Sequence, residues 1–447
     1  MIKNSIEMEK YYIQDIQDNL EKHQESGLVS LDYLEHSTAK YHGKTIYSLY
    51  VPKLISEETE LILKTAAETM ANIMRKVIKE YQKNEKYRKL FGFSKELEEL
   101  ILINPNYDNV LPVCRVDIFL NEETGGYYFC ELNTDGSSSM NEDRELCLAF
   151  EKTYLYKQLS RDYELNSFEL FDSLVDAFLD NYQSYKYKVD KPNIAIVDFL
   201  ELGCSNEEFE QFRLCFEKRG LNAVICDIRD LSLMDDGLYS DKGMKIDLIY
   251  RRAVTSDIME HKNEVWDFVD GILEEKVCCM GNFCTQVVHD KSLFYILRDE
   301  QTKAILSQKE NEFIDLHIPY TEELTLEIVK AKKILENKNQ WLIKPKNSYG
   351  ARGIFAGVNF AYDEWEKIVY DHLDKNVIVQ QFIMPYQSEN IDFHKEDPKL
   401  CKYSNLTGLY VYNGKFSGVY SRQANHEIIS SSYDENDIAT IRYREKK

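Results

Sequence analysis

Residues 115–139, RVDIFLNEETGGYYFCELNTDGSSS, hold the most informative pattern in this chain. Two apolar runs flank a turn at Glu123-Thr124-Gly125-Gly126, which is typical of two strands joined as a hairpin. On each strand two polar side chains stand two positions apart, so they share a face. The four are Arg115 and Asp117 on the first strand and Glu131 and Asn133 on the second. If the strands pair around the turn, these four side chains converge.

The chemistry of the four residues suits a site for magnesium and phosphate. Asp117, Glu131 and Asn133 offer the oxygen donors that Mg²⁺ prefers, and Mg²⁺ usually shares its shell with phosphates and water. The guanidinium of Arg115 beside them can bind the anion that the metal also holds. The alternative is a solvent-exposed strand face, although apolar residues stand between the polar ones.

Bulk composition limits the class of partner. The 447 residues are 43% hydrophobic, which is ample for a packed core, and length alone suggests about three domains. The net charge of -22 repels phosphate backbones and anionic headgroups. We therefore expect no nucleic acid and no membrane as partner. A small anionic substrate would need a local basic pocket.

Targeting signals and cysteine motifs are missing from the sequence. The first residues, MIKNSIEMEKYY, lack the apolar core of a signal peptide, and no run reaches the roughly 20 apolar residues of a membrane span. The ten cysteines are scattered and form no CxxC motif, which argues against a zinc site or a disulfide framework. We expect a cytoplasmic protein with reduced thiols.

The pattern along the chain predicts four parts. Residues 1–100 look helical, with a helix start near Ser56. Residues 101–189 hold the polar hairpin and then return to helical patterning. Residues 190–285 alternate as strand, helix, glycine and strand, the βαβ signature of a parallel Rossmann-like lobe, but without the GxGxxG of a dinucleotide site. In residues 286–447 shorter helices and strands alternate.

Two lysines stand out in the last part. In WLIKPKNSYGARGIFAGV, Lys344 ends an apolar strand before a loop of small residues. Backbone N–H groups of such a loop can approach phosphate oxygens, and the strand-anchored lysine adds a fixed positive charge. The alternative is an ordinary hairpin with an exposed lysine. In VVHDKSLFYIL, Lys291 starts a helix-like run, and taken alone it reads as a solvated lysine.

Two further strand patterns follow. VIVQQFIMP, residues 377–385, is either a core strand or a strand whose backbone groups meet an adenine edge. LTGLYVYNGKFSGVYSRQA predicts a hairpin that turns at Asn413-Gly414, a strong hairpin dipeptide. Arg422 near the end of this hairpin shares a strand face with Tyr420. The alternative to a functional role is an exposed arginine on an edge strand.

Together these motifs resemble the ATP-grasp ligases, most closely the glutathionylspermidine synthetase family, over roughly residues 110–425. The hairpin motif precedes the two lysines, which is the permuted order of that family. The resemblance implies an α/β fold with α+β elements, ATP-grasp-like, with a Rossmann-like lobe beside it. It also implies an ADP-forming carbon–nitrogen ligase that uses ATP and Mg²⁺ to join a carboxylate to an amine through an acyl phosphate.

The resemblance assigns roles residue by residue. The implied metal ligands are Asp117, Glu131 and Asn133, and the implied catalytic arginines are Arg115 and Arg422. The implied ATP contacts are Lys291, Lys344, Ser348, Tyr349, Gly350, Gly353, Gln380, Gln381, Phe382 and Ile383. The implied contacts to the acid substrate are Asn133, Asp135, Ser137 and Ser138. Candidate loops to close the site are residues 348–353 and 386–405.

This sequence also departs from the family. The loop after Asn133 reads Thr-Asp-Gly-Ser-Ser, and because that loop helps to define the acid, glutathione is in doubt as the substrate. The first hundred residues contain no cysteine, so we expect no amidase activity. Two other classes stay open: an ATP-grasp-like kinase that stops at phosphoryl transfer, and a non-catalytic nucleotide-binding partner protein. The sequence leaves the oligomeric state open.

Overall fold

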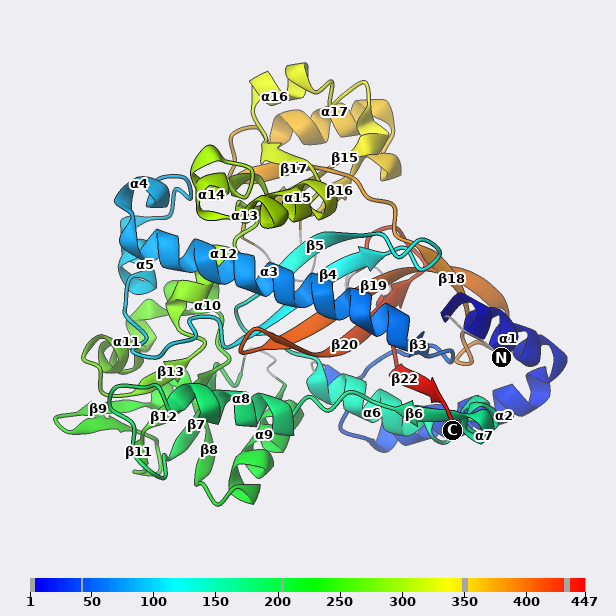
Figure 1. Cartoon of the computed structure of the whole chain (residues 1–447), viewed down its shortest axis with the longest axis horizontal. Helices are drawn as coiled ribbons and strands as arrows, with labels where there is room; N and C mark the ends of the chain where they lie inside the picture. The colour runs from blue at the N-terminus through cyan, green and yellow to red at the C-terminus, as the bar shows by residue number, and fades with distance from the viewer. Residues whose placement is uncertain (1–4, 42, 202–204, 348–352, 430–434, 447) are drawn as a thin grey trace.

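The computed structural model describes residues 5–41, 43–201, 205–347, 353–429 and 435–446 (Figure 1). A six-stranded antiparallel sheet forms its centre, in the order β21-β20-β19-β4-β5 with β18 paired to β19. Its strands are β4 (Val113–Leu120), β5 (Tyr127–Asn133), β18 (Gln387–Ile391), β19 (Leu400–Tyr412), β20 (Lys415–Ala424) and β21 (Glu435–Ile438). Both predicted hairpins are confirmed, and β4 and β19 join them into one sheet.

A long helix, α3 (Glu57–Lys83), lies along the central sheet (Figure 1). Ser56 begins the helix as predicted, because its side chain accepts a hydrogen bond from the N–H of Thr59 at 3.2 Å. The face of α3 toward the sheet is apolar and fully buried, with Met70 and Met74 in one core with Val116 of β4. Burial of this apolar stripe fixes the helix against the sheet that carries the polar hairpin.

The Rossmann-like lobe is confirmed as a parallel sheet. Its strands run in the order β13-β12-β7-β8, and every neighbouring pair is parallel. The elements are β7 (Ile194–Asp198), α9 (Asn206–Lys218), β8 (Ala223–Asp227), β12 (Leu248–Arg251) and β13 (Cys278–Met280), with α8 (Asp172–Tyr182), α10 (Thr255–Glu260) and α11 (Trp266–Leu273) around them. A small antiparallel sheet extends the lobe through β9 (Ser232–Met234), β10 (Gly237–Tyr239) and β11 (Lys245–Ile246).

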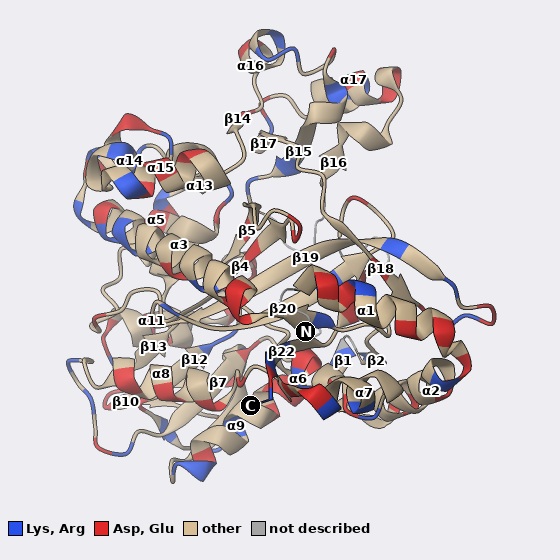
Figure 2. Cartoon of the chain, turned by 45° about the vertical axis from the view of Figure 1, so that its right-hand side comes forward, with Lys and Arg blue, Asp and Glu red and all other residues tan. Residues whose placement is uncertain are grey.

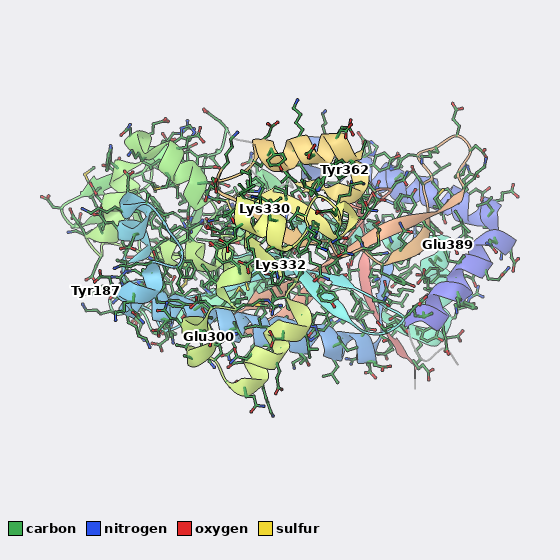
Figure 3. All side chains as sticks on the ribbon, turned by 90° about the horizontal axis from the view of Figure 1, so that it is seen from above. Tyr187, Glu300, Lys330, Lys332, Tyr362 and Glu389 are labelled. Carbon is green, nitrogen blue, oxygen red and sulfur yellow. The ribbon has the colours of Figure 1, made fainter. Side chains whose placement is uncertain are left out.

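A second antiparallel sheet carries the Lys344 strand. It runs in the order β14-β17-β15-β16, with strands β14 (Thr321–Glu323), β15 (Trp341–Pro345), β16 (Phe355–Ala356) and β17 (Val377–Gln381). Helices α16 (Leu326–Ala331) and α17 (Tyr362–Asp371) cover it, with Trp365 fully buried between them and the sheet. Seen from above, this unit lies over the middle of the molecule and carries Lys330, Lys332 and Tyr362 (Figure 3).

The first hundred residues are mostly helical, through α1 (Ser5–Asp18), α2 (Leu20–His36), α3, α4 (Glu85–Arg88) and α5 (Lys95–Ile101). Three short strands were not predicted: β1 (Lys40–Tyr41), β2 (Lys44–Thr45) and β3 (Lys53–Ile55). Strand β3 pairs with the C-terminal strand β22 (Thr440–Glu445), and the two ends of the chain share one apolar core. A helical pattern cannot reveal such a pairing, because the partner strand lies almost 400 positions away.

The hypothesis that residues 386–405 form a loop over the site is wrong. Most of this stretch belongs to β18 and to the first half of β19, which pair with each other. Some of the polar side chains that suggested a loop are buried in the sheet region: Asn390 bonds to the backbone of Val51 and to Gln423. The pairing therefore satisfies polar groups that would otherwise need solvent.

The remaining elements connect these parts. They are α6 (Met140–Phe150), α7 (Tyr154–Asp162), β6 (Tyr163–Asn166), α12 (Gln286–His289), α13 (Leu293–Ile296), α14 (Glu300–Ile305) and α15 (Gln308–His317). In the view of Figure 2, acidic residues occur in every part of the chain, with basic residues between them. Within the described residues, no helix is long and apolar enough to cross a membrane.

Candidate active site

The polar residues of the first hairpin come together as predicted. The cross-strand pairs of β4 and β5 are Arg115–Asn133 and Asp117–Glu131. The register shifts after Asp117, because Cys130 is an extra residue on β5. With strict alternation Phe129 would share the face of Glu131. The bulge instead pairs Phe129 with Ile118, in the core, while Glu131 pairs with Asp117. The bulge could not be predicted from the sequence, because the prediction assumed a strict two-residue alternation of side chains.

Asp117 lies beneath two arginines. Its Oδ1 accepts from Nε of Arg115 at 2.8 Å, and its Oδ2 accepts from Nη2 of Arg115 at 3.1 Å and from Nη2 of Arg422 at 2.6 Å. The Asp117 side chain is fully buried, and Arg422 is 12% exposed on a strand between β19 and β21. The interpretation of Arg422 as an exposed edge-strand residue is therefore wrong. The picture of Asp117 on an open polar face is also wrong.

Close packing around this cluster depends on Gly408. Gly408 of β19 pairs in register with Asp117. A Cβ atom on Gly408 would lie 2.9 Å from Cδ of Arg115 and 2.9 Å from Oδ1 of Asp117, which is too close. Burial lowers the pKa of the Arg115 guanidinium, but the charge of Asp117 more than reverses this, so the pKa lies well above its usual value. The sequence signal for this position was a glycine inside an apolar strand.

The two predicted lysines reach the same hairpin. Nζ of Lys291 lies 3.1 Å from Oε1 of Glu131, and Nζ of Lys344 donates to the carbonyl of Cys130 at 3.0 Å. Burial alone would raise the pKa of Glu131, but the charges of the two lysines outweigh the effect of burial and lower the pKa to about 2. Burial and the charge of Lys291 lower the pKa of Lys344 to about 8. Both lysines are buried, so the reading of either as a surface residue is wrong.

A cavity of about 500 Å³ is lined by six of the predicted site residues: Arg115, Glu131, Asn133, Lys291, Lys344 and Arg422. At the end near the lysines, the described wall is made by Pro319, Leu342, Ile354, Gln380, Gln381, Phe382 and Ile383. The predicted adenine strand thus lines the cavity. Its backbone is partly engaged, because the N–H of Gln381 donates to Tyr320 and the N–H of Phe382 to Gln340, each at 2.8 Å. The side chain of Gln380 donates to Thr321 at 2.8 Å.

Part of the predicted phosphate loop lies outside the described residues. This applies to Ser348, Tyr349 and Gly350, three of the residues predicted to contact ATP. Gly353 is described; it is exposed, has a φ of +74°, and is not among the described residues that line the cavity. The phosphate role of this loop therefore stays a prediction.

The loop after β5 supplies the opposite wall. Asn133, Asp135, Ser137 and Ser138 all line the cavity, as predicted for contacts to the acid substrate. The Asp135 carboxylate, however, is already paired: Oδ1 accepts from Nη2 of Arg251 at 2.6 Å and Oδ2 from the N–H of Thr255 at 2.7 Å. Asp135 therefore anchors the loop to the Rossmann-like lobe and does not present a free carboxylate.

Sequence reasoning missed the acidic part of the cavity wall, where Oε2 of Glu435 lies 3.4 Å from Nη1 of Arg422. Glu142, Glu435 and Asp437 line it, with Lys44 and Tyr47 from the N-terminal region. Burial and the neighbouring Glu435 raise the pKa of Asp437 to about 7. Burial raises the pKa of Glu142 well above its usual value, and its Oε2 has no hydrogen-bond partner in the described structure. Glu142 stands four positions after Ser138, the last residue predicted to contact the substrate, and this proximity was the available sequence signal.

The donor set at the hairpin fits a hard cation. No group of three His, Cys, Asp or Glu side chains placed for a metal exists in the described structure, so carboxylates alone do not make a site. Asn133 would supply the third oxygen. Its amide nitrogen donates to Oδ2 of Asp117 at 3.2 Å, and its cross-strand partner Arg115 is two residues from Asp117, the partner of Glu131. Two carboxylates and an amide are ligands that Mg²⁺ accepts. Asp117 would coordinate only by exchanging an arginine contact.

Comparison with solved structures bears on the fold. The chain superimposes on the apo structure of a glutathione synthetase-like effector from Globodera pallida with a TM-score of 0.63, covering 93% of this chain and 96% of that one at 12% identity. The chain has an ATP-grasp-like fold. At this identity the likeness establishes the fold alone.

Two further solved structures superimpose on the chain with lower TM-scores. A putative gamma-glutamylcysteine synthetase from Methylobacillus flagellatus reaches a TM-score of 0.42 at 10% identity over 83% of this chain and 88% of that chain. D-alanyl-alanine synthetase A from Vibrio cholerae reaches 0.25 at 9% identity over 57% and 89%. No protein-family model matches the chain, and no curated protein matches it.

Proposed function

We propose that this protein is an ATP- and Mg²⁺-dependent ligase that joins a carboxylate to an amine through an acyl phosphate, in the manner of the glutathionylspermidine synthetases. The observation that supports it most is the convergence of two arginines and two lysines on one 500 Å³ cavity. They come from four separate segments: β4, β20, the turn before α13, and β15. In a chain with a net charge of -22, such a concentration of buried cations favours an anionic ligand.

The two steps of the proposed reaction give the lysines and the arginines different roles. In the first step a carboxylate oxygen of the acid attacks the γ-phosphorus of ATP, and ADP leaves. In the second step the amine nitrogen attacks the acyl carbon, the bond to phosphate breaks, and the amine releases a proton. Lys291 and Lys344 would hold the ATP phosphates, while Arg115 and Arg422 would stabilise the charge on the transferring phosphoryl group.

Magnesium would be held by Glu131 and Asn133 at the cavity wall, with Asp117 behind them. When bound, it would neutralise negative charge between the phosphates. The chain's own part is positional: the bulge at Cys130 turns Glu131 toward the cavity, and the cross-strand pairing sets Asn133 beside Arg115. Ser137 and Ser138, in the loop that follows, would contact the acid.

A screen for ADP release tests the proposal. Purified protein with ATP and Mg²⁺ is offered small peptides and amino acids as acids, together with a set of amines, and products are identified by mass. We expect slow ADP release with ATP and Mg²⁺ alone, a much faster release that needs both an acid and an amine, and an amide product of matching mass. A stable phosphorylated product formed without any amine would instead identify a kinase.

Two controls make the screen decisive. Lys344→Ala, which removes a buried cation from the cavity, should abolish the acid- and amine-dependent ADP release. Lys330→Ala, on the exposed face of α16 in the same part of the molecule, should leave it unchanged (Figure 3). Absence of ATP binding to the wild-type protein would remove both the ligase and the kinase.

A further inference from the structure

The substrate loop, residues 134–139, occupies the position in the Rossmann-like lobe where open parallel sheets usually bind ligands. In open parallel sheets, ligands bind beyond the carboxyl ends of the strands, at the point where strand order reverses. Here that point lies between β7 and β12. A Cβ atom on Gly136 would stand 2.9 Å from the carbonyl oxygen of Arg252, just after β12, and 2.7 Å from Cγ1 of Val254. The substrate loop is therefore pressed against the end of this sheet.

Two buried ion pairs fasten the ends of the loop. The first is the pair of Asp135 with Arg251, both 1% exposed. The second is Glu208 of α9 with Arg252, at 2.6 Å between Oε1 and Nη1. Glu208 is fully buried, which carboxylates almost never are unless they have a specific partner such as Arg252.

Glu208 also caps the helix that follows the loop. Its Oε2 accepts from the N–H of Met140 at 2.7 Å and of Asn141 at 3.2 Å, the first residues of α6. Ser139 stands at the N-cap position with a φ of +82° and makes no side-chain cap. A carboxylate from the lobe thus replaces the local cap and favours this helix end by its charge.

The middle of the same loop touches the catalytic arginine. The carbonyl oxygen of Ser138 accepts from Nη1 of Arg115 at 3.0 Å and from the hydroxyl of Tyr410 at 2.6 Å. Ser138 is one residue before Ser139, where the Glu208 cap begins. A displacement of the α6 end would therefore move the carbonyl that orients Arg115.

From these contacts we infer that Glu208 is a positioning residue: it fixes the substrate loop and, through Ser138, the guanidinium of Arg115. This inference rests on the proposed function, because it takes Arg115 as the residue that meets the phosphoryl group. It gives the lobe, which lacks a nucleotide motif, a defined part in the reaction.

The test compares Glu208→Gln and Glu208→Asp with Glu210→Gln in the full-length protein. Glu210 lies on the same helix, pairs with Arg213 and is half exposed. The probe is ATP with Mg²⁺, followed as slow ADP release. We expect both Glu208 variants to lose at least tenfold in kcat with KM for ATP within twofold of wild type. Glu210→Gln should match wild type. Glu208→Asp keeps the buried charge, so it serves if the amide variant does not fold.

A second measurement separates positioning from general loss of structure. Amide hydrogen exchange of the peptide 134–142 should be at least tenfold faster in Glu208→Asp, while peptides of β15 and β17 keep wild-type rates. Combining Glu208→Asp with Arg115→Lys should cost less than the product of the single losses, whereas combining it with Lys344→Ala should give the full product. Unchanged kcat, or unchanged exchange in the loop, overturns the inference.

The failures of the two proposals are distinguishable. If wild-type protein does not bind ATP in calorimetry, the proposed function fails. If it binds and hydrolyses ATP, and Arg115→Lys slows hydrolysis but neither Glu208 variant does, only the positioning role fails.

Discussion

Arg422 donates to Oδ2 of Asp117 at 2.6 Å across 305 positions of sequence. Arg115, two residues before Asp117 on β4, donates to Oδ1 of the same carboxylate at 2.8 Å. One buried carboxylate thus holds two guanidiniums close together at the wall of the cavity. Two like charges would otherwise repel, so Asp117 is the counterion that makes the arrangement stable.

Replacing Arg422 should separate phosphoryl transfer from nucleotide binding. Arg422→Lys is expected to keep ATP affinity and to lose most of kcat, because an ammonium cannot reproduce the planar fork of a guanidinium. Arg422→Ala should lose more, about 3–4 kcal/mol of transition-state stabilisation. Steady-state ADP release with ATP calorimetry measures both. Arg444→Lys, a partly exposed arginine on β22, is the control. Wild-type kcat in Arg422→Ala would exclude the residue from the site.

Removing either lysine should weaken nucleotide binding. Lys344→Ala and Lys291→Ala each delete a charge-assisted contact, which is worth about 1.5–3 kcal/mol or roughly ten- to a hundredfold in Kd. Lys291→Ala should also lower thermal stability, because Glu131 then loses its ion-pair partner. Calorimetric titration with ATP gives the affinities. Equal affinity in wild type and both variants would remove the phosphate role.

Neutralising Glu131 should make turnover depend more steeply on magnesium. Glu131→Gln keeps the shape of the side chain but removes a charge from the oxygen-donor set. We expect strongly reduced ADP release at low Mg²⁺ and partial recovery as Mg²⁺ rises. Glu123→Gln, at the exposed turn of the same hairpin, should show the wild-type Mg²⁺ dependence. Full activity of Glu131→Gln at low Mg²⁺ would contradict the metal assignment.

A methyl group at position 408 should displace the ion pair of Arg115 and Asp117. In Gly408→Ala the new Cβ would sit 2.9 Å from both Arg115 and Asp117, so the strands or the ion pair must move. Overpacking of this kind costs about 1–3 kcal/mol in unfolding free energy. We also expect at least a tenfold loss in kcat. Denaturant unfolding and ADP release test the two effects. Gly126→Ala, in the exposed turn between β4 and β5, should change neither.

Asp437 should make the protein less stable as pH rises through neutrality. Its pKa is raised to about 7 by burial and by Glu435, whereas an unfolded aspartate titrates near 3.9. Between these values the unfolded state is ionised and the folded state holds the proton, so the free energy of unfolding falls by about 1.4 kcal/mol per pH unit. Asp437→Asn should lack this pH dependence, so its stability relative to wild type should rise between about pH 4 and pH 7 and then level off. An identical pH profile in both proteins would refute it.

Local patterns in the sequence were sufficient for the separate pieces of the structure. A turn dipeptide and side-chain alternation specify a hairpin through contacts between near neighbours, so the strands around Gly125 and around Asn413 could be predicted. The βαβ order of the lobe followed in the same way from residues close in sequence. The placement of Glu131 beside Asn133 on one face also came from the sequence alone.

Only the tertiary structure decided how those pieces act on one another. The burial of Asp117 under Arg115 and Arg422 and the capping of α6 by Glu208 depend on side chains brought together from distant segments. The acidic part of the cavity wall around Asp437 also combines residues that are distant in sequence. A charged residue has the same letter whether it is solvated or buried, and its state is set by the partner that balances its charge. That partner is chosen by the packing of sheets and helices, which no local pattern encodes.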